Sequence, residues 1–299
     1  MRLVGDLLES SWGRDFRSKS SDFTRGGSLT PEVLLTLMLF MAGDAGRRGY
    51  GHLLEDFWIE ARRSGIALPC EDPVTAVAFC KARRKLRPAL FATLLSKVCA
   101  LLAERNDEWL RWRGRRIYAV DGMRHNTQRA AELTRAFGVP SGSHCPQMLV
   151  SALFDVVGKF PCAATIAPNA SCERQELLKL LDHLKAGDVL VLDRGYPSFE
   201  VIQALRFRGI EFVMRVPKSH SFEAIDVFQE GGHDDCRMII KPSPQAARAG
   251  VQPLDLRMVR IDVSVDDPWI LLTSLPRSEV TRFVMGQTYH LRWEIEELY

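Results

Sequence analysis

Apolar residues recur at helical spacing through the first third of the chain. Thr30 and Pro31 form a favourable helix start, the threonine as N-cap and the proline in the first turn, ahead of the apolar run 33–41. Further amphipathic helices are expected over 50–64, 73–87 and 90–112. The pattern predicts an α-helical N-terminal domain over residues 1–113.

From residue 114 onward the apolar runs become short and strand-like. Alternating strands and helices typify an α/β layer fold, here predicted over 114–299. Residues 218–275 turn strand-rich and irregular, and a last helix is expected from Ser278 to the end. The expected strands are 116–122, 148–155, 160–166, 189–193, 211–216, 238–240, 256–265 and 269–273, and the expected helices between them are 171–184 and 199–207.

Composition narrows the class of protein. The 299 residues are 46% hydrophobic and 26% charged, which indicates a soluble globular chain. Residues 1–120 hold 20 lysines and arginines against 14 acids, whereas residues 121–299 hold 20 against 23. A basic front half fits a polyanionic partner, although ordinary helical surfaces are also often basic. An acidic back half fits a site that collects metal ions.

The cysteine spacing and the longest apolar run indicate the cellular compartment of the protein. Seven cysteines without any Cys-x2-Cys pair argue against zinc and indicate reduced thiols in the cytoplasm. No signal peptide is evident, and the apolar run 33–42 is too short to span a bilayer. We therefore expect a cytoplasmic protein with no membrane partner.

Two carboxylates each follow a buried strand. Asp121 and Asp193 end the runs 116–121 and 189–193, and sites in α/β sheets form at that edge. The alternative is that each aspartate simply caps a turn. The tight turn after Asp193 also offers Arg194, which could reach a phosphate or pair with the aspartate.

A third carboxylate lies near the end of the chain. At helical spacing Tyr289, Arg292 and Glu296 share one face, where the carboxylate could hold a metal ion and the other two a phosphate. The alternative is a solvated face with surface acids. With Asp121 and Asp193, Glu296 would complete a site for two magnesium ions about 4 Å apart, suited to phosphoryl transfer on nucleic acid.

Several motifs in order carry a family resemblance. They are YAVDGM (118–123), SALFDVVGKF (151–160), GDVLVLDRGYPS (187–198), WILLTSLP (269–276) and YHLRWEIEELY (289–299). The chain resembles the DDE transposases of bacterial insertion sequences, of the IS-four type with a Tyr-x2-Arg-x3-Glu-x6-Lys signature. The resemblance implies an α/β fold with a ribonuclease-H-like catalytic core, interrupted by a β-rich insertion at 218–275.

The resemblance also implies residue roles. Asp121, Asp193 and Glu296 would hold catalytic magnesium, for which manganese could substitute, while Tyr289 and Arg292 would contact phosphates of the transposon end. Where the reaction forms DNA hairpins, an aromatic on the strand leaving the insertion stacks on a flipped base, and Trp269 matches that position. A buried strand tryptophan is the alternative for Trp269.

The implied activity is cut-and-paste transposition. Water nicks the element end, and the freed 3′-hydroxyl attacks the opposite strand or the target. The implied partners are double-stranded DNA, as inverted-repeat ends and as target, and a second copy in a homodimer on paired ends, associated with the nucleoid. The N-terminal helices would bind the ends through one of two basic clusters, Arg83, Arg84, Lys85 and Arg87 or Arg111, Arg113, Arg115 and Arg116. Both could equally be solvated, ion-paired faces.

The chain departs from the signature at one point. The signature lysine would fall near position 303, but the sequence stops at Tyr299. We therefore expect a C-terminally truncated transposase whose Glu296 lies on a helix liable to fray. Two alternatives follow: an inactive chain that only binds DNA, and a metal-dependent nuclease without strand transfer.

Overall fold

The computed structural model describes residues 16–44, 48–217, 222–263 and 268–296. The chain separates into two compact units, residues 1–98 and 99–299. The division falls within helix α5 (Ala89–Asn106), ahead of position 113, where the sequence suggested a domain boundary.

The first unit is helical, with α2 (Pro31–Ala42), α3 (Tyr50–Arg63), α4 (Ala76–Arg83) and the start of α5. The Thr30 hydroxyl accepts a hydrogen bond from the Val33 amide, so the expected N-cap is present. Trp58 is 1% exposed in the core, and its indole N–H donates to the Cys70 carbonyl at 3.2 Å. The amphipathic pattern thus located α2, α3 and α4 to within four residues, but it extended the fourth helix to 112, whereas α5 ends at Asn106.

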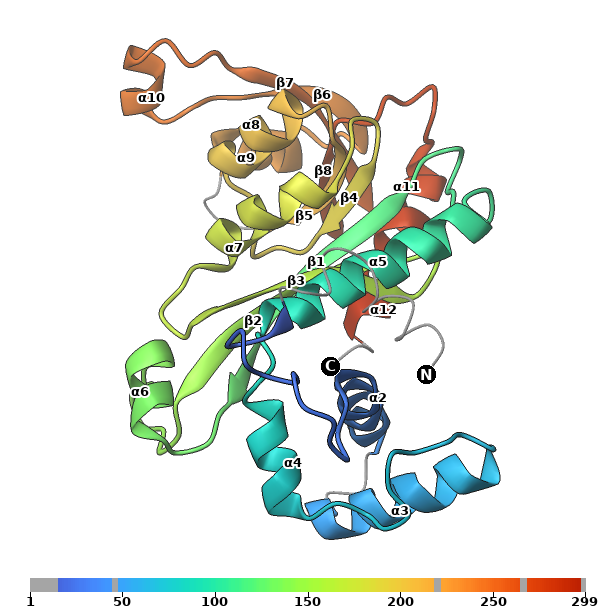
Figure 1. Ribbon diagram of the computed structural model, residues 1–299. Helices are drawn as coiled ribbons and strands as arrows, with labels where there is room; N and C mark the ends of the chain where they lie inside the picture. Colours follow the sequence, from blue (N-terminus) through green and yellow to red (C-terminus); the bar gives the residue numbers. More distant parts are fainter. Residues whose placement is uncertain (1–15, 45–47, 218–221, 264–267, 297–299) are drawn as a thin grey trace. The chain divides into compact units, whose positions relative to one another are not determined.

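The second unit is built on one eight-stranded sheet in the order β3-β2-β1-β4-β5-β8-β7-β6 (Figure 1). β1 pairs antiparallel with β2 and parallel with β4, and β5 is parallel to β4. The antiparallel run β3-β2-β1 followed by parallel β4 and β5 forms the ribonuclease-H-like core that the motifs implied. The strands are β1 (Ile117–Asn126), β2 (Gln147–Asp155), β3 (Phe160–Pro168), β4 (Val189–Leu192), β5 (Glu211–Val216), β6 (Asp235–Ile240), β7 (Leu254–Ile261) and β8 (Trp269–Thr273).

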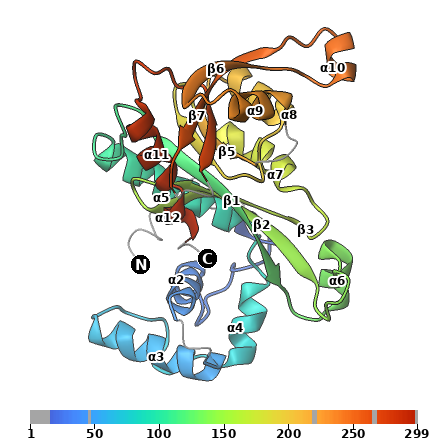
Figure 2. The same cartoon turned by 180° about the vertical axis from the view of Figure 1, so that it is seen from behind.

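Helices cover both faces of the sheet, which explains why β4 is apolar at every position. Leu190 and Leu192 face a core shared with α7 (Glu173–Leu180), α8 (Phe199–Phe207) and α9 (Glu223–Glu230). Val189 and Val191 face the other core, shared with α11 (Arg282–His290) and α12 (Trp293–Glu296) (Figure 2). Side chains of one strand therefore alternate between two layers of helices.

The insertion extends the core sheet. β8 pairs antiparallel with β5, and β7 and β6 continue outward from it. The sequence suggested only strands here, but the structure adds α9 and the short α10 (Pro244–Arg248). It also adds α6 (Ala131–Phe137) before β2, and the 3-10 turn η2 (Leu181–His183) ends the helix expected over 171–184. The strand expected over 256–265 is observed as β7, and positions 264 and 265 lie outside the described residues.

The expectation of one continuous helix from Ser278 to the end was wrong. α11 begins after its N-cap Thr281, and Leu291 and Arg292 form a turn before α12. At this turn the backbone hydrogen bonds join residues three positions apart instead of four. The Arg292 amide, for example, donates to the Tyr289 carbonyl at 3.1 Å. The last three positions, 297–299, lie outside the described residues.

Two expectations about the cellular location of the protein concerned its cysteines and the length of its apolar helices. All seven cysteines are free thiols. Within the described part of the chain, no helix combines the length and apolarity that a bilayer crossing requires.

Candidate active site

Asp121 lies on β1, and Asp193 directly follows β4, the parallel neighbour of β1. Ala119 of β1 is paired with Val191 of β4, and each aspartate lies two positions further along its own chain. Each also bonds to a nearby amide: Gly122 donates to Asp121 Oδ1 at 2.9 Å, and Gly195 donates to Asp193 Oδ1 at 2.8 Å. The two carboxylates therefore lie at the same edge of the core, and each is held by a hydrogen bond from a nearby backbone amide.

The two aspartates differ in their strand context. β4 ends at Leu192, so Asp193 follows a strand end as expected. β1, however, continues to Asn126 along β2, so Asp121 lies inside a strand at the point where β1 parts from β4. The expectation that Asp121 also ends a strand was wrong, because the antiparallel pairing with β2 outlasts the parallel pairing with β4.

The pKa of Asp121 is raised above its ordinary value, chiefly because burial penalises the charged form. The nearby carboxylates of Asp193 and Glu173 raise this pKa further, while the Gly122 amide bond and the Arg292 guanidinium oppose the rise. Two further acids and one arginine thus act electrostatically on Asp121. A half-buried site with excess negative charge favours a bound cation.

Glu173 is the site residue that the sequence did not reveal. It opens α7, and its carboxylate pairs with Arg124 at 3.2 Å. A Cβ on Gly122 would lie 2.9 Å from Glu173 Cγ, so α7 packs closely over β1 at this glycine. Only its position in the first turn of a helix was visible beforehand, and that position gives no hint of packing against Asp121.

Tyr289 and Arg292 remain together despite the break in the last helix. Tyr289 is 2% exposed and Arg292 is 8% exposed, and the guanidinium carbon lies 5.7 Å from the tyrosine ring centre. Burial is the main cause of the raised pKa of Tyr289. The Arg292 Nε–H is buried and has no hydrogen-bond partner among the described residues. The pair thus lies in the protein interior, and the alternative of a solvated face holds only for Glu296.

Trp269 contributes to the same cluster. It is partly buried, its ring centre lies 5.1 Å from that of Tyr289, and the Arg215 guanidinium lies 5.5 Å from it. Both contacts help to fix the tryptophan at the start of β8. Arg194, next to Asp193, is exposed. A role for either residue in binding DNA remains a prediction.

Glu296 is exposed, and its carboxylate pairs with Arg292 Nη2 at 2.7 Å. Across the described ranges, no group of three or more histidine, cysteine, aspartate or glutamate side chains is arranged to hold a metal ion. Asp121 and Asp193 fit a hard divalent cation by donor chemistry, because they offer neighbouring oxygen ligands. Glu296 as the third ligand remains a prediction.

A family model covers this edge of the sheet. The model described as a transposase DDE domain matches residues 112–299, which includes both aspartates and the Tyr289–Arg292–Glu296 segment. The chain belongs to this family. DDE transposases use divalent metal ions, in keeping with the acid-rich edge.

Solved structures of transposases are similar to this DDE transposase chain at low identity. The piggyBac transposase synaptic complex with hairpin DNA is 12% identical with a TM-score of 0.47, covering 99% of this chain and 63% of that one. The Mos1 transposase paired-end complex with left transposon end is 12% identical with a TM-score of 0.24, covering 65% of this chain and 62% of that one. This chain thus matches less than two thirds of the length of either structure. A search of curated proteins gave no match.

Proposed function

We propose that this chain is a DNA transposase that cleaves insertion-sequence ends and transfers the freed strand. The observation that carries the proposal is the pair Asp121, on β1, and Asp193, directly after the adjacent parallel strand β4, within a chain that belongs to the DDE domain family. The charge of Asp193 adds to the cost of ionising Asp121, and two such neighbouring carboxylates suit a divalent-metal site for phosphodiester chemistry. The spacing of Tyr289, Arg292 and Glu296 supports the IS-four type.

The residues would divide the chemistry between them. Asp121 and Asp193, with Glu296, would hold magnesium, which when bound lowers the pKa of the attacking water and offsets charge on the phosphate. Arg292 would donate to a non-bridging phosphate oxygen, and its 2.7 Å ion pair with Glu296 would keep that carboxylate near the edge. Glu173 would position Asp121 from the facing helix.

Two displacements follow one another in the proposed reaction. In the first, the oxygen of water bonds to phosphorus, the bond from phosphorus to the 3′ oxygen breaks, and a 3′-hydroxyl is released. In the second, that hydroxyl attacks a phosphodiester of the opposite strand or the target, and the displaced 3′-hydroxyl leaves. The first step leaves a 5′-phosphate and the second forms a new phosphodiester; each exchanges one P–O bond for another, so no oxidant or energy source is needed.

The first basic cluster is the better candidate for binding DNA. Residues 73–103 hold six lysines and arginines and no aspartate or glutamate. Arg83, Arg84, Lys85 and Arg87 are exposed there. In the second cluster Arg111 pairs with Asp107, Arg115 with Glu279 and Arg116 with Asp155. Charge already neutralised within the chain contributes less to a DNA contact.

The test is strand cleavage by the full chain. Linear duplexes made from the genomic DNA on either side of the gene are incubated with magnesium or manganese, and nicked and joined strands are resolved on denaturing gels. Both product classes are expected, and Asp193→Ala is expected to abolish them. Binding with no nicking, equal in wild type and Asp193→Ala, would favour the DNA-binding alternative. Nicking without joined products would favour a nuclease.

A homodimer on paired ends is part of the same proposal, because two ends must be cut together. Light scattering of the purified chain, with and without end duplexes, gives the mass of the complex. A mass of two chains with two duplexes is expected. One chain per duplex under conditions that support cleavage would contradict the dimer.

A further inference from the structure

Arg174 connects helix α7 to the turn that carries Asp193. Its Nε–H donates to the Gly195 carbonyl at 2.9 Å, and the amide of the same glycine donates to Asp193 Oδ1 at 2.8 Å. Within the described residues, the Arg174 side chain makes no other hydrogen bond and pairs with no carboxylate. Gly195 is therefore held on both sides, by the arginine at its carbonyl and by the aspartate at its amide.

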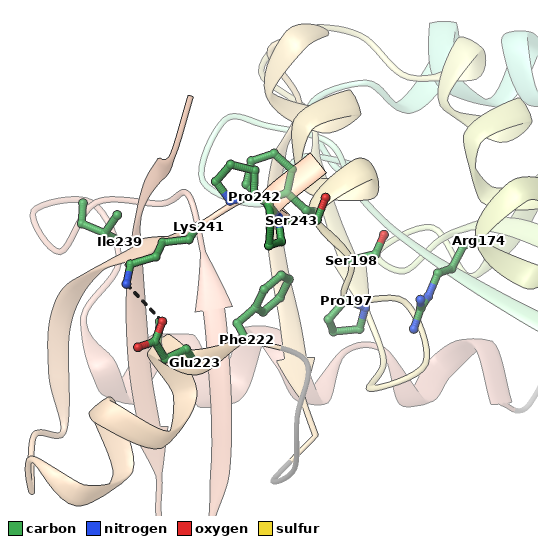
Figure 3. Close-up of a pocket in the computed structure, with 12 residues that line it drawn as sticks. Arg174, Pro197, Ser198, Phe222, Glu223, Ile239, Lys241, Pro242 and Ser243 are labelled. Carbon is green, nitrogen blue, oxygen red and sulfur yellow. Dashed lines mark hydrogen bonds and ion pairs between the residues drawn. The ribbon is translucent and has the colours of Figure 1, made fainter. Parts of the chain in front are cut away.

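Arg174 reaches this turn along the wall of a pocket of about 660 Å³ (Figure 3). In that view it lies on the side of Pro197 and Ser198, which follow the turn in the sequence. The acid of the pocket lining, Glu223, lies at the other end and pairs with Lys241 at 3.1 Å. The arginine is therefore engaged by a backbone carbonyl of the turn and not by the acid of the pocket.

Helix α7 gives this hydrogen bond a rigid support. Leu177 and Leu180, on the same helix, are fully buried in the core. One position before Arg174, Glu173 packs over β1, where a Cβ on Gly122 would lie 2.9 Å from Glu173 Cγ. The first turn of α7 thus contacts β1 beside one candidate metal ligand and the turn after β4 beside the other.

The turn leaves the Asp193 carboxylate little freedom. A Cβ on Gly195 would lie 3.1 Å from Asp193 Oδ1, which is closer than an ordinary contact. Tyr196 follows in the core, fully buried, and its amide donates to the Asp193 carbonyl at 3.3 Å. A displacement of Gly195 would therefore move the carboxylate with it.

We propose that Arg174 is a positioning residue for the divalent-metal site, acting through the Gly195 carbonyl to orient the Asp193 carboxylate. The inference rests on the proposed function, because it takes Asp121 and Asp193 as metal ligands. Ligands of a catalytic metal must be held within about 0.5 Å of their productive geometry, which requires support from neighbouring groups. Helix α7 supplies that support, with Glu173 over β1 and Arg174 on the turn after β4.

The test compares two variants that lose the same charge but differ in the hydrogen bond. Manganese is titrated into the full chain without DNA, and the free ion is measured by electron paramagnetic resonance. Arg174→Met removes the donor and is expected to weaken manganese binding about threefold to tenfold, the range for one lost hydrogen bond. Arg174→Gln keeps an N–H donor at the same place along the side chain and should bind within about twofold of wild type. Equal manganese affinities in the two variants would overturn the proposal.

Arg194 is the matched control. It lies next to Asp193, it is exposed, and its side chain makes no hydrogen bond or ion pair within the described residues. Removing a cation beside a metal site favours the metal by charge alone, so Arg194→Met should bind manganese at least as tightly as wild type. If Arg194→Met weakens manganese binding as much as Arg174→Met, the loss is not specific to the Gly195 bond and the proposal fails.

Gly195→Ala tests the turn without any change of charge. The added methyl group crowds the Asp193 carboxylate, so manganese binding is expected to weaken. Combined with Arg174→Met, its effect should be smaller than the product of the two separate effects, because both changes act on one turn. A full product would contradict the route through the turn. If Arg174→Met does not fold, Gly195→Ala still decides, because wild-type manganese affinity in that variant would show that the turn does not orient the carboxylate.

The positioning role and the proposed function fail separately. Wild-type manganese affinity in Asp193→Ala would remove the metal site itself. Loss of manganese binding and cleavage in Asp193→Ala, with equal binding by Arg174→Met and Arg174→Gln, would leave the transposase and remove only the positioning role. Weaker binding of end duplexes by Arg174→Met, with manganese affinity unchanged, would assign Arg174 to DNA instead.

Discussion

At the scale of single residues, Asp121 is the strongest test of the site. Asparagine keeps its shape but removes the charge that would hold a metal ion. Asp121→Asn is expected to lower cleavage by at least about 100-fold while DNA affinity stays within about threefold, because phosphate contacts dominate binding. Gel assays of nicking and anisotropy measure the two quantities. Asp182→Asn, at an exposed acid paired with Arg208, is the matched control and should cleave like wild type.

The raised pKa of Asp121 gives a second prediction, for the metal-free protein. Because the pKa is higher in the folded state, the native chain binds more protons, so stability falls as the pH rises from the unfolded pKa through the raised pKa. Asp121→Asn removes this cost. Its melting temperature at neutral pH should exceed that of wild type by roughly 2 °C or more, and the difference should shrink as the pH falls through the raised pKa. A difference that grows on acidification would contradict the assigned cause.

The sequence predicted some residues of the candidate site and missed others. Asp121 and Asp193 were found because a buried apolar run ending in an acid is visible in the sequence. Glu173 was missed because its neighbour Asp121 is 52 positions away, and only the packing of α7 over Gly122 brings them together. Helical spacing joined Tyr289 to Arg292 correctly, but it could not reveal that both are buried.

At the scale of elements, one buried ion pair holds α11 against the sheet. Arg257 of β7 pairs with Asp235 of β6 at 2.7 Å, and its Nη1 donates to the carbonyl of Val280, just before α11, at 2.7 Å. The arginine side chain is 3% exposed and the aspartate side chain 9%. This pair therefore fixes the start of the helix that carries Tyr289.

Removing one partner of that pair should be costly. Asp235→Ala leaves the guanidinium buried without its carboxylate and is expected to destabilise the protein by about 3 kcal/mol. Asp255→Ala, at the exposed partner of Arg237, should cost less than about 0.5 kcal/mol. Urea unfolding followed by circular dichroism measures both. Similar losses of stability in the two variants would show that burial of the Arg257 pair contributes little.

Elements with strong periodicity were predictable, and short irregular ones were not. β4 and β5 were located within a residue because both of their faces are buried. α9 and α10 were missed, since helices of eight and five residues leave little periodic signal in a strand-rich segment. The break at Leu291 was missed because the apolar spacing continues across it. Only the change to backbone hydrogen bonds between residues three positions apart marks the turn.

At the scale of the whole molecule, ion pairs distinguish the two basic clusters in a way that the sequence alone could not. In the sequence both clusters are runs of basic residues, so each was a candidate for binding DNA. The structure shows the second cluster bonded within the chain, whereas residues 73–103 contain no acid to pair with. The difference lies in contacts between distant positions, such as Arg115 with Glu279, which no local pattern encodes.

Equal charge changes in the two clusters should therefore have unequal effects. Arg83→Gln, Arg84→Gln and Lys85→Gln together are expected to weaken duplex binding at least about tenfold and to reduce the salt slope by roughly 2 to 3, near 0.9 for each phosphate that the variant no longer neutralises. The triple change at Arg111, Arg113 and Arg115 alters net charge equally, but it should shift affinity less than about threefold. Anisotropy with a labelled duplex over a salt series measures both. The reverse order would assign DNA binding to the second cluster, and equal reductions in affinity would mean that net charge alone governs duplex binding.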